Sequence, residues 1–449
     1  MDFSQPGFYP FQSYSEAVDF LFGLQRFGIK LGLKNMHRML KAFGNPHRNL
    51  KVIHITGSNG KGSVAAFVAK ILQKSGYRVG LYTSPHLLDF SERIRINGEP
   101  IPFSEVVNLT CLIRTTQFQV EEEDGTKGDP TSVTSMTFFE FTTLIALLYF
   151  VKNKVDFAVV EVGMGGRLDA TNVLTPLVAV ITNVSKEHTQ YLGKSLMEIA
   201  EEKAGIIKPN TFLITGVTQP KILAKFRSHC QKRRCIMYYF GKEIKIKTED
   251  FGGFNYQGIF SSYTDLKIGV NGKYQVVNAA LALGVTEVLR KQGFQISEEA
   301  IREGLREMKW PGRLELICQK PRVLLDGAHN PAGIKRLVDE LKNGFTYKRL
   351  FLVIGIMQDK AIKSILNQII PLGDYVIFTQ PKIDRAASPF LLFKAIEHFN
   401  KKAEVITEVS AAVKKAMSLA DKEGDLVCVT GSLFVVGEAR KIFYSQVEV

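Results

Sequence analysis

The stretch "VIHITGSNGKGSVAAFVAKILQKSG", residues 52–76, decides the fold of this chain. Its first five residues are mostly β-branched and predict a buried strand. After the glycine-rich loop, apolar residues recur at helical spacing until Gly76, which is suited to end a helix. The segment "YRVGLYT" then predicts a second strand. Strand, loop, helix and strand form a βαβ unit, which implies a parallel sheet.

The loop "GSNGKGS", residues 57–63, has the features of a phosphate-binding loop. Glycines let backbone amides point inward at a helix N-terminus, where the helix dipole favours anions, and a lysine can reach the terminal phosphates. The spacing departs from the pattern G-x-x-x-x-G-K-[ST], because Gly62 separates Lys61 from the hydroxyl group of Ser63. A glycine-rich turn with an incidental lysine is the alternative. The strand before the loop and the helix after it favour phosphate binding.

The composition is that of a globular protein, with 449 residues and 45% apolar side chains, enough for two or three domains. The five cysteines are odd in number and scattered, so neither a disulfide framework nor a C-x-x-C metal site is indicated. The first residues lack the features of a signal peptide. The strongest candidate for a membrane span, "FFEFTTLIALLYFV", is short and contains Glu140, so we interpret it as a buried core helix. We expect a cytoplasmic protein without a membrane partner.

The net charge of +14 favours anionic partners, which could be nucleic acid, a membrane surface or small molecules with phosphate and carboxylate groups. The densest basic stretch, "KFRSHCQKRR", lacks the interleaved aromatic residues of a platform for single-stranded nucleic acid. It also lacks the frame of a DNA-reading motif. We interpret it as a solvated helix face and expect no nucleic-acid partner.

Further along the chain, "DFAVVEV" and "LVAVITNV" predict two more buried strands. Between residues 211 and 273 the pattern changes to shorter alternating runs, including "KEIKIK" and "TDLKIGVNGKY". With a turn expected at Asn271 and Gly272, these runs predict a small antiparallel section.

Pro311 and Gly312 break the helical pattern that follows, so we expect two domains, at residues 1–308 and 309–449. In the second, the strands "RVLLD", "RLFLVIG", "DYVIFTQ", "AEVI" and "DLVCVTG" alternate with helical stretches. This alternation predicts a doubly wound, Rossmann-like α/β domain.

Glu161 ends the strand "DFAVVEV", at the edge where open α/β sheets place their ligand groups. A carboxylate that faces a triphosphate suits Mg2+, which takes oxygen ligands from few protein groups and from phosphates. Alone, an acidic residue at a strand end is commonplace. The residues that follow, "GMGGRLDATN", strengthen the interpretation, because the glycines permit a close approach and Arg167, Asp169 and Asn172 add polar groups.

Other polar residues also follow predicted strands. His188 in "SKEHTQYLG" shares the sheet edge with Glu161, although a lone histidine is usually structural. Lys203 in "IAEEKAGIIK", taken alone, would be a surface charge. In the second domain, "LLDGAHNPAG" places Asp326 and His329 at a strand end, and "VTGSLFVVG" does the same for Ser432. Two such edges predict a substrate cleft between the domains.

Together these stretches resemble the folylpolyglutamate synthase and dihydrofolate synthase family, within the larger group of Mur ligases. The resemblance runs through "LGLKNMHRMLKAFGNPH", "HITGSNGKGS", "GLYTSPHLLDFSERIRING", "TFFEFTTLIAL", "VVEVGMGGRLDATNV", "ITNVSKEHTQYLG", "IAEEKAGIIK", "WPGRLE", "DGAHNPAG" and "TGSLFVVG", in the family's order. The loop with a glycine between the lysine and the hydroxyl residue is the Mur type of phosphate loop.

The resemblance implies roles for individual residues. ATP would be held by Ser58, Asn59, Gly60, Lys61, Gly62, Ser63, Asn278, Arg313 and Asp326. Mg2+ would be held by Ser84, Glu161 and His188, and Lys203 matches a lysine that is carbamylated in the family. Lys61, Glu161, His188 and Lys203 would be the catalytic set. The pterin substrate would contact Thr137, Phe138, Phe139, Glu140, Leu168, Asp169 and Ala170, and glutamate would contact His329 and Ser432.

The chain departs from the family pattern at three places. Ser58 stands where threonine is usual, and Glu187 replaces the aspartate that usually precedes His188. The segment between "RIRING" and "TFFEF" is also longer than in compact bacterial relatives.

The implied activity is ATP-dependent ligation of L-glutamate to dihydropteroate, to reduced folates or to both, through an acyl phosphate. The enzyme would be a monomer. One alternative is a Mur-type ligase that adds an amino acid to a cell-wall precursor, and "TSPHLLDFSERIRING" argues against it. A nucleic-acid-stimulated ATPase with Glu161 as its catalytic carboxylate is a second alternative, supported mainly by the net charge.

Overall fold

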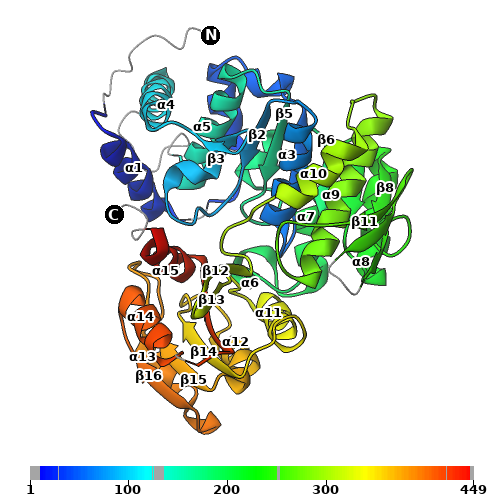
Figure 1. The fold of residues 1–449 in the computed structure, drawn as a ribbon. Helices are drawn as coiled ribbons and strands as arrows, with labels where there is room; N and C mark the ends of the chain where they lie inside the picture. The colour runs from blue at the N-terminus through cyan, green and yellow to red at the C-terminus, as the bar shows by residue number, and fades with distance from the viewer. Residues whose placement is uncertain are drawn as a thin grey trace. The chain divides into compact units, whose positions relative to one another are not determined.

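The computed structural model describes residues 11–28, 30–123, 125, 136–249, 253–420 and 422–444. The chain divides into two compact units. The first consists of Met1–Lys267 and Val277–Met308, and the second of Ile268–Val276 and Lys309–Val449. In Figure 1 the first unit runs from blue to green, and the second is mostly yellow to red. Both are built on parallel-rich sheets, so the predicted α/β class is confirmed.

The first unit contains an eight-stranded sheet with the order β4-β3-β2-β5-β1-β6-β7-β8. The six strands from β2 to β8 in this order pair in parallel, and β3 and β4 are antiparallel at one edge. The predicted βαβ unit is present, with β5 between its two strands. The strands are β1 (Val52–Thr56), β2 (Val79–Tyr82), β3 (Ile94–Ile96), β4 (Glu99–Pro100), β5 (Phe157–Glu161), β6 (Pro176–Ile181), β7 (Phe212–Thr215) and β8 (Ile236–Tyr239).

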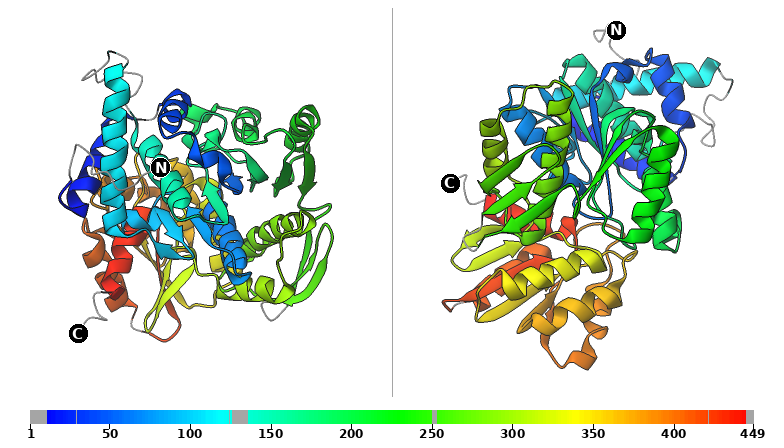
Figure 2. Two further views of the ribbon diagram at one scale, coloured as in Figure 1. Left: turned by 90° about the horizontal axis from the view of Figure 1, so that it is seen from above. Right: turned by 90° about the vertical axis from the view of Figure 1, so that its right-hand side faces the viewer.

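Helices of the first unit pack on this sheet and on one another. They are α1 (Tyr14–Gly23), α2 (Lys34–Ala42), α3 (Lys61–Lys74), α4 (Phe103–Glu123), α5 (Phe138–Lys152), α6 (Thr189–Leu192), α7 (Leu196–Ala204), α8 (Pro220–Arg233), α9 (Lys273–Lys291) and α10 (Glu298–Glu307). The first turn of α9 belongs to the second unit. α1 and α4 lie side by side, dark blue and cyan in Figure 2.

Two packing arrangements position the phosphate-type loop. α3 packs on β1, β2 and β5, and α10 packs closely on α3, since a Cβ at Gly304 would lie 2.7 Å from the Cα of Ile71. α4 and α5 form a core cluster with the sheet face that carries Val52 and Val160. Residues 140–150 of α5 are all buried, because this helix is apolar on nearly every side. The predicted core helix is therefore confirmed.

The predicted antiparallel section is present as a three-stranded sheet with the order β11-β10-β9. Its strands are β9 (Lys245–Thr248), β10 (Phe254–Gln257) and β11 (Ser262–Leu266). The expected hairpin turn at Asn271 and Gly272 is wrong. No strand follows it, because α9 starts at Lys273, where the apolar residues change to helical spacing.

The second unit contains a six-stranded sheet with the order β12-β13-β17-β14-β15-β16. All neighbours pair in parallel except β12 and β13. The five predicted strands are present, and β12 is an additional edge strand. The strands are β12 (Glu315–Gln319), β13 (Arg322–Leu325), β14 (Arg349–Ile354), β15 (Tyr375–Phe378), β16 (Lys402–Val405) and β17 (Asp425–Thr430).

The helices of the second unit are α11 (Pro331–Asn343), α12 (Ile362–Ile369), α13 (Pro389–Lys394), α14 (Val409–Leu419) and α15 (Leu433–Tyr444). α11, α12 and α13 share a buried apolar cluster with β14 and β15. α14 and α15 pack on β14 and β17. Among all helices in the described ranges, none has the length and apolar character needed to cross a bilayer.

Candidate functional site

The loop between β1 and α3 is shaped by its glycines. Gly57 and Gly60 have φ angles of 149° and 85°, a region that side chains rarely adopt. A Cβ at Gly57 would clash with the hydroxyl of Thr182, and one at Gly60 would lie 2.5 Å from Oδ1 of Asn278. Both neighbours belong to the first unit. The loop therefore lies directly against the segment after β6 and against α9, and the structure brings Asn278 to the loop as expected.

Side chains of the loop are anchored to the segment that follows β6. The hydroxyl of Ser58 donates to the carbonyl of Ser185 (3.1 Å) and accepts from its amide (3.0 Å). The amide of Asn59 donates to Oδ1 of Asn183 at 3.1 Å. Thr182, Asn183 and Ser185 are not among the site residues predicted from the sequence, although polar residues directly after a buried strand are a usable signal.

Lys61 is the first residue of α3, and its ammonium donates to the carbonyl of Gly57 at 3.0 Å. The lysine thus folds back over its own loop. The first amides of a helix have no partner within the helix, and they point along the axis at the N-terminus. An ammonium and a helix N-terminus at one loop form a suitable site for a phosphate group.

Glu161 and Ser84 lie together at the ends of two neighbouring strands, β5 and β2. Glu161 is 5% exposed, and its Oε2 accepts from the amide of Ser84 at 3.1 Å. In the described part of the chain, no group of three or more His, Cys, Asp or Glu side chains is arranged to hold a metal. A buried carboxylate next to a serine residue still fits Mg2+, because this ion is commonly held by one or two carboxylates together with phosphate and water.

His188 follows β6, which is separated from β5 by β1. It directly precedes α6 and has a φ angle of 45°, the left-handed region that few residues other than glycine adopt. The order of strands therefore places His188 and Glu161 at the same edge of the sheet, two strands apart.

Lys203 is buried, so the interpretation as a surface charge is wrong. Its side chain is 1% exposed, and its ammonium donates to Oε1 of Glu187 at 2.7 Å. The sequence around Lys203 is rich in charge, but α7 turns this residue inward onto the segment after β6. Charge density along a helix does not identify which residue faces the interior.

The Lys203 and Glu187 pair is influenced by Lys61. Burial alone would raise the pKa of Glu187, but the ammonium groups of Lys203 and Lys61 outweigh it and lower the pKa to about 2. Burial lowers the pKa of Lys203, and Lys61 adds to this effect while Glu187 opposes it. The phosphate-type loop, the segment after β6 and α7 therefore form one electrostatic group.

The glycine-rich loop after β5 packs against the end of α7. A Cβ at Gly166 would lie 2.8 Å from the carbonyl of Glu202, and one at Gly205 would clash with the backbone of Arg167. Arg167 donates from its amide to the Glu202 carbonyl at 2.8 Å and from its guanidinium to the Glu202 carboxylate at 2.7 Å. The glycines in "GMGGR" thus let this loop approach the turn of helix that carries Lys203.

Asp169 organises the same loop. Its carboxylate is buried and accepts from the amide of Met164 at 2.9 Å and from the hydroxyl of Thr171 at 2.5 Å. Burial raises the pKa of Asp169, and these hydrogen bonds oppose the rise. Leu168 accepts from the amide of Gly32 at 3.4 Å, which ties the loop to the segment before α2. The contacts of Leu168 and Asp169 with a pterin stay predictions.

Thr137 and Glu140 form a capping box at the start of α5. Glu140 accepts from the amide of Thr137 at 2.8 Å, and the Thr137 hydroxyl accepts from the amide of Glu140 at 3.3 Å. Glu140 also accepts from Asn35 of α2 at 3.4 Å. The spacing T-x-x-E is a signature of this cap and could have been recognised in the sequence. The structure thus gives both residues a role in the fold.

Phe138 and Phe139 lie in an aromatic cluster. Phe138 stacks on Phe22 at 5.7 Å between ring centroids, and the guanidinium of Arg93 lies 5.1 Å from its centroid. The ring of Phe139 lies where a Cβ at Gly163 would clash with it. Phe22 is partly exposed, so one side of the cluster is accessible to a planar ligand.

In the second unit, Asp326 follows β13 and is 3% exposed. It accepts from the amides of Leu314 and Ala328, both at 3.0 Å, and from the hydroxyl of Tyr274 at 3.5 Å. Burial raises the pKa of Asp326, and Arg313 opposes the rise.

Tyr274 was not nominated from the sequence, and it borders a cavity of the second unit. The cavity measures about 330 Å³ and is also lined by Lys273, Arg336 and Glu340. Arg336 lies over the ring of Tyr274 at 5.7 Å. The cavity thus lies beside a residue that contacts Asp326.

His329 and Ser432 follow β13 and β17, which are adjacent strands. Nδ1 of His329 lies 2.9 Å from the carbonyl of Gly327. The hydroxyl of Ser432 accepts from the amide of Val435 at 3.1 Å, so Ser432 caps α15. The same sheet edge therefore carries both residues, as their positions after predicted strands implied.

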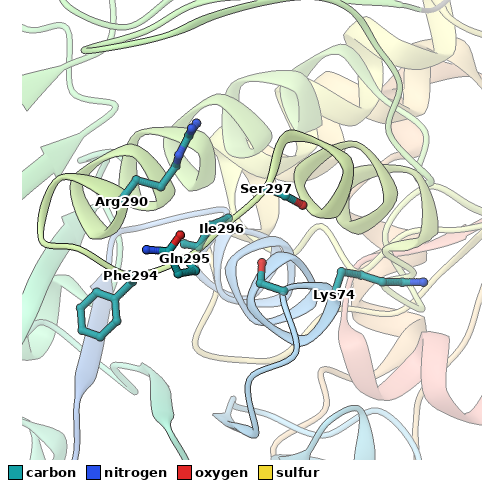
Figure 3. A pocket seen from close by; sticks show the side chains of 7 residues that line it. Lys74, Arg290, Phe294, Gln295, Ile296 and Ser297 are labelled. Carbon is teal, nitrogen blue, oxygen red and sulfur yellow. The ribbon is translucent and has the colours of Figure 1, made fainter.

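A larger cavity of the first unit, of about 580 Å³, is lined by residues 74–75, 290 and 294–297. It lies at the C-terminal end of α3, roughly 20 Å along that helix from Lys61. Figure 3 shows Lys74 and Arg290 pointing in different directions. Lys74 pairs with Glu307 at 2.8 Å, and Arg290 donates to the hydroxyl of Tyr263. None of the residues nominated from the sequence lines this cavity.

The chain is similar to known proteins over nearly its whole length. Residues 104–286 match the family model of the Mur ligase middle domain, and residues 312–433 match the Mur ligase, glutamate ligase domain. The dihydrofolate synthase/folylpolyglutamate synthase of Bacillus subtilis is 35% identical over 448 residues, which covers 96% of this chain and 99% of the relative.

Solved structures resemble the chain over nearly its whole length. The Mycobacterium tuberculosis folylpolyglutamate synthase complexed with ADP and AMPPCP has a TM-score of 0.87 and 32% identity, covering 95% of this chain and 99% of the other. E. coli FolC in complex with DHPP and ADP has a TM-score of 0.84 and 29% identity, with complete coverage of both chains.

Proposed function

The chain belongs to the folylpolyglutamate synthase and dihydrofolate synthase family of Mur ligases, and from this premise we propose that it joins L-glutamate to a pterin-containing carboxylic acid with ATP. It is a ligase that forms carbon–nitrogen bonds. One observation carries the proposal: a phosphate-type loop at the start of α3 lies beside a buried group of charges, Glu187 and Lys203. The complexes of relatives with ADP support ATP as the nucleotide.

Amide formation would take place in two steps. First, an oxygen of the acceptor carboxylate attacks the γ-phosphorus of ATP, the bond to ADP breaks and an acyl phosphate forms. Second, the amine of glutamate attacks the acyl carbon, phosphate leaves and the nitrogen loses a proton. Lys61 would stabilise charge on the transferring phosphoryl group. Release of its ammonium from the Gly57 carbonyl would make it available for this contact.

ATP would be bound by the loop residues Ser58, Asn59, Gly60, Lys61, Gly62 and Ser63, and by Asn278, Arg313 and Asp326. The contacts of Gly60 with Asn278 support the first group. The hydroxyl of Ser58 is engaged with Ser185, so we assign its contact with phosphate to the backbone amide. Arg313 and Asp326 are assigned by resemblance.

Mg2+ would be held by Ser84, Glu161 and His188. The buried carboxylate of Glu161 beside Ser84 supports this assignment. The ion would neutralise charge on the phosphates of ATP. The hydrogen bond that Glu161 accepts from the Ser84 amide would hold the backbone of Ser84 next to the ion.

Lys203 is proposed to be carbamylated. An ammonium close to a divalent cation would be repelled by about 4 kcal/mol per unit charge at ~4 Å and an effective dielectric of 20. Burial lowers the pKa of Lys203, which increases the share of neutral amine that can react with CO2. The carbamate would be anionic and could accept hydrogen bonds. It would also be repelled by Glu187, which must then move away or bind a cation.

The pterin would contact Thr137, Phe138, Phe139, Glu140, Leu168, Asp169 and Ala170. The accessible aromatic cluster around Phe138 supports this assignment, because planar rings stack favourably on aromatic side chains. Glutamate would contact His329 and Ser432, at the edge of the second sheet. Residues 1–308 would act as the ATP-binding domain and residues 309–449 as a Rossmann-like glutamate ligase domain, which the two family-model matches support.

We infer that both dihydropteroate and reduced folates are acceptors. The name of the B. subtilis relative, which covers both activities, and the DHPP complex of E. coli FolC support this choice. We also propose a monomeric enzyme that acts in the cytoplasm without a nucleic-acid or membrane partner.

The test is an assay of purified protein with ATP, Mg2+ and labelled glutamate, in which each acceptor is offered in turn. We expect label in the product with dihydropteroate and with tetrahydrofolate. Label with only one of them would contradict the dual activity. ATP hydrolysis that responds to DNA and to neither pterin would overturn the proposed function. A cell-wall precursor serves as a third acceptor and should give no product.

A further inference from the structure

The central strand β1 holds the substrate-side loop through two side chains. His54 and Thr56 are two residues apart, so they point to the same face of the sheet. Nε2 of His54 lies 2.8 Å from the hydroxyl of Thr171. The hydroxyl of Thr56 donates to the carbonyl of Gly165 at 2.5 Å. β1 therefore contacts the segment 163–173 at two places, Gly165 near the start of the segment and Thr171 near its end.

The hydrogen bonds that connect His54, Thr171 and Asp169 have a defined donor and acceptor at each step. The Thr171 hydroxyl has one hydrogen, and it lies 2.5 Å from Oδ1 of Asp169. An ionised carboxylate only accepts, so Thr171 donates to Asp169 and accepts from His54. Burial lowers the pKa of His54 to about 3, so the ring is neutral and its single proton is on Nε2. The series of donors runs from His54 through Thr171 to Asp169.

Asp169 passes this constraint to the loop. Its other oxygen, Oδ2, accepts from the amide of Met164 at 2.9 Å, and Oδ1 also accepts from the amide of Thr171 at 3.0 Å. The carboxylate therefore joins the first and last parts of the 163–171 segment. A displaced Thr171 hydroxyl would leave Asp169 with one fewer donor and free its side chain to turn.

The histidine is a poor choice for stability alone. Its side chain is fully buried, and Nδ1 has no hydrogen-bond partner among the residues that the structure describes. A buried polar atom without a partner destabilises a fold, so an apolar side chain of similar size would suit this position better. The hydrogen bond from His54 to Thr171 is therefore better explained by the position of the loop that it holds than by the stability of the fold.

We propose that His54 is a positioning residue, which together with Thr56 keeps the 163–171 loop in register with the phosphate-type loop. β1 leads directly into that loop, so the same strand sets both positions. This inference rests on the proposed function, in which the two loops hold the acceptor and the γ-phosphate. A 163–171 loop that is already held in place would lose less conformational entropy when the pterin acceptor binds, which would lower the KM for that acceptor.

The first experiment compares His54→Leu with His54→Gln. Leucine fills the space without a donor, and the glutamine amide can donate to Thr171 in place of Nε2. We expect His54→Leu to raise the KM for the pterin acceptor about tenfold, the value of one ordinary hydrogen bond. The KM for ATP should stay unchanged and the unfolding midpoint should not fall. His54→Gln should restore most of the lost affinity.

His47→Leu is the matched control. His47 is also a buried histidine of the first unit with an unpartnered Nδ1, and it lies in the 3-10 turn Pro46–Asn49. Its replacement should leave both KM values unchanged. A similar rise in KM for His47→Leu, or a His54→Gln variant as impaired as His54→Leu, would overturn the proposal.

A second experiment needs no catalysis. Hydrogen exchange of peptides that cover residues 163–171 reports whether the Met164 and Thr171 amides keep their bond to Asp169. We expect about tenfold faster exchange there in His54→Leu and in Thr171→Val, and parent-like exchange in Thr171→Ser. Unchanged exchange in His54→Leu and Thr171→Val would overturn the proposal. If the parent instead fails to ligate glutamate, the proposed function fails, while the exchange comparison still decides whether His54 anchors the loop.

Discussion

The carboxyl-end edges of the two sheets use polar side chains in different ways. At the first edge, Lys203 and Glu187 form a buried ion pair between two segments, within electrostatic reach of Lys61. At the second edge, Ser432 caps α15 and Asp326 accepts from backbone amides of its own unit. The polar residues of the second edge can be explained by the needs of the fold. The needs of the fold do not explain the buried charges of Lys203 and Glu187 at the first edge.

The energetics of buried charge explain why this difference matters. Removing two charges from water costs more than a typical ion pair returns, so apolar residues of similar size are often as stable. Lys203 is 1% exposed and Glu187 is 9% exposed, so both are desolvated. A pair that the fold does not need is better explained by chemistry. The first edge therefore carries the stronger indication of function, because the stability of the fold does not account for its buried charges.

The largest expected effect tests the first edge directly. Lys61→Ala and Glu161→Gln should each lower product formation by at least about 10²-fold, because each removes charge compensation for ATP. The unfolding midpoint should be unchanged. Lys74→Ala is the matched control, since it removes a lysine at the opposite end of α3, where it pairs with Glu303 and Glu307. Near-normal turnover of Lys61→Ala would contradict a functional role for the charges at the first edge.

Lys203 gives the next largest effect and separates chemistry from folding. Lys203→Ala should lose most activity and regain part of it with acetate, whose carboxylate replaces that of the carbamate. Lys203→Arg should stay inactive, because a guanidinium remains positive. Mass spectrometry under conditions that preserve carbamates should find a gain of CO2 at Lys203. An active enzyme with unmodified Lys203 would contradict this prediction.

The same position also has a stability effect to be controlled. In protein whose Lys203 is not carbamylated, Lys203→Ala leaves Glu187 buried without its partner, which should cost about 3 kcal/mol in free energy of unfolding. The double variant Lys203→Met, Glu187→Gln removes both charges and should regain this stability while it stays inactive. If activity returned with stability, the ion pair would serve the fold alone and the two edges would no longer differ.

A smaller effect concerns His54 in β1, the strand that leads to the phosphate-type loop at the first edge. The pKa of His54 is lowered by burial from 6.5 to about 3, so the unfolded chain binds this proton more readily than the folded one. Stability should therefore fall as the pH drops below 6.5, by about 2 kcal/mol between pH 7 and pH 5. Urea unfolding should be measured for the parent and for His54→Leu at both pH values. Between pH 7 and pH 5, the free energy of unfolding of His54→Leu should fall by about 2 kcal/mol less than that of the parent. Equal sensitivity of both proteins would contradict a buried, neutral His54.

The smallest effect tests the second edge. Ser432→Ala removes the cap of α15 and should cost about 1 kcal/mol in free energy of unfolding. Ser297→Ala removes a comparable cap, that of α10, and should cost a similar amount. A rise in KM for glutamate in Ser432→Ala alone would assign Ser432 a contact with substrate. Equal KM values in both variants would leave Ser432 as a cap, which sharpens the contrast between the edges.

Local patterns in the sequence were sufficient for most of the fold. The run from β1 through α3 to β2 could be predicted because strand and helix differ in their apolar period and glycine marks the loop. Four of the five parallel strands of the second unit, all except β16, were recognisable by their continuous apolar character. The turn at Asn271 and Gly272 was wrong because the same dipeptide also precedes helices.

What the sequence determined by itself was therefore the class of the fold, the phosphate-type loop and the residues that follow each strand. Only the tertiary structure decided how those residues are used. It paired Lys203 with Glu187, joined Glu140 to Asn35 of α2 and connected His54 to Asp169 through Thr171. The physical reason is that burial and hydrogen-bond partners depend on segments far apart in the chain. Periodicity records which way a side chain points, and it carries no information on what that side chain meets.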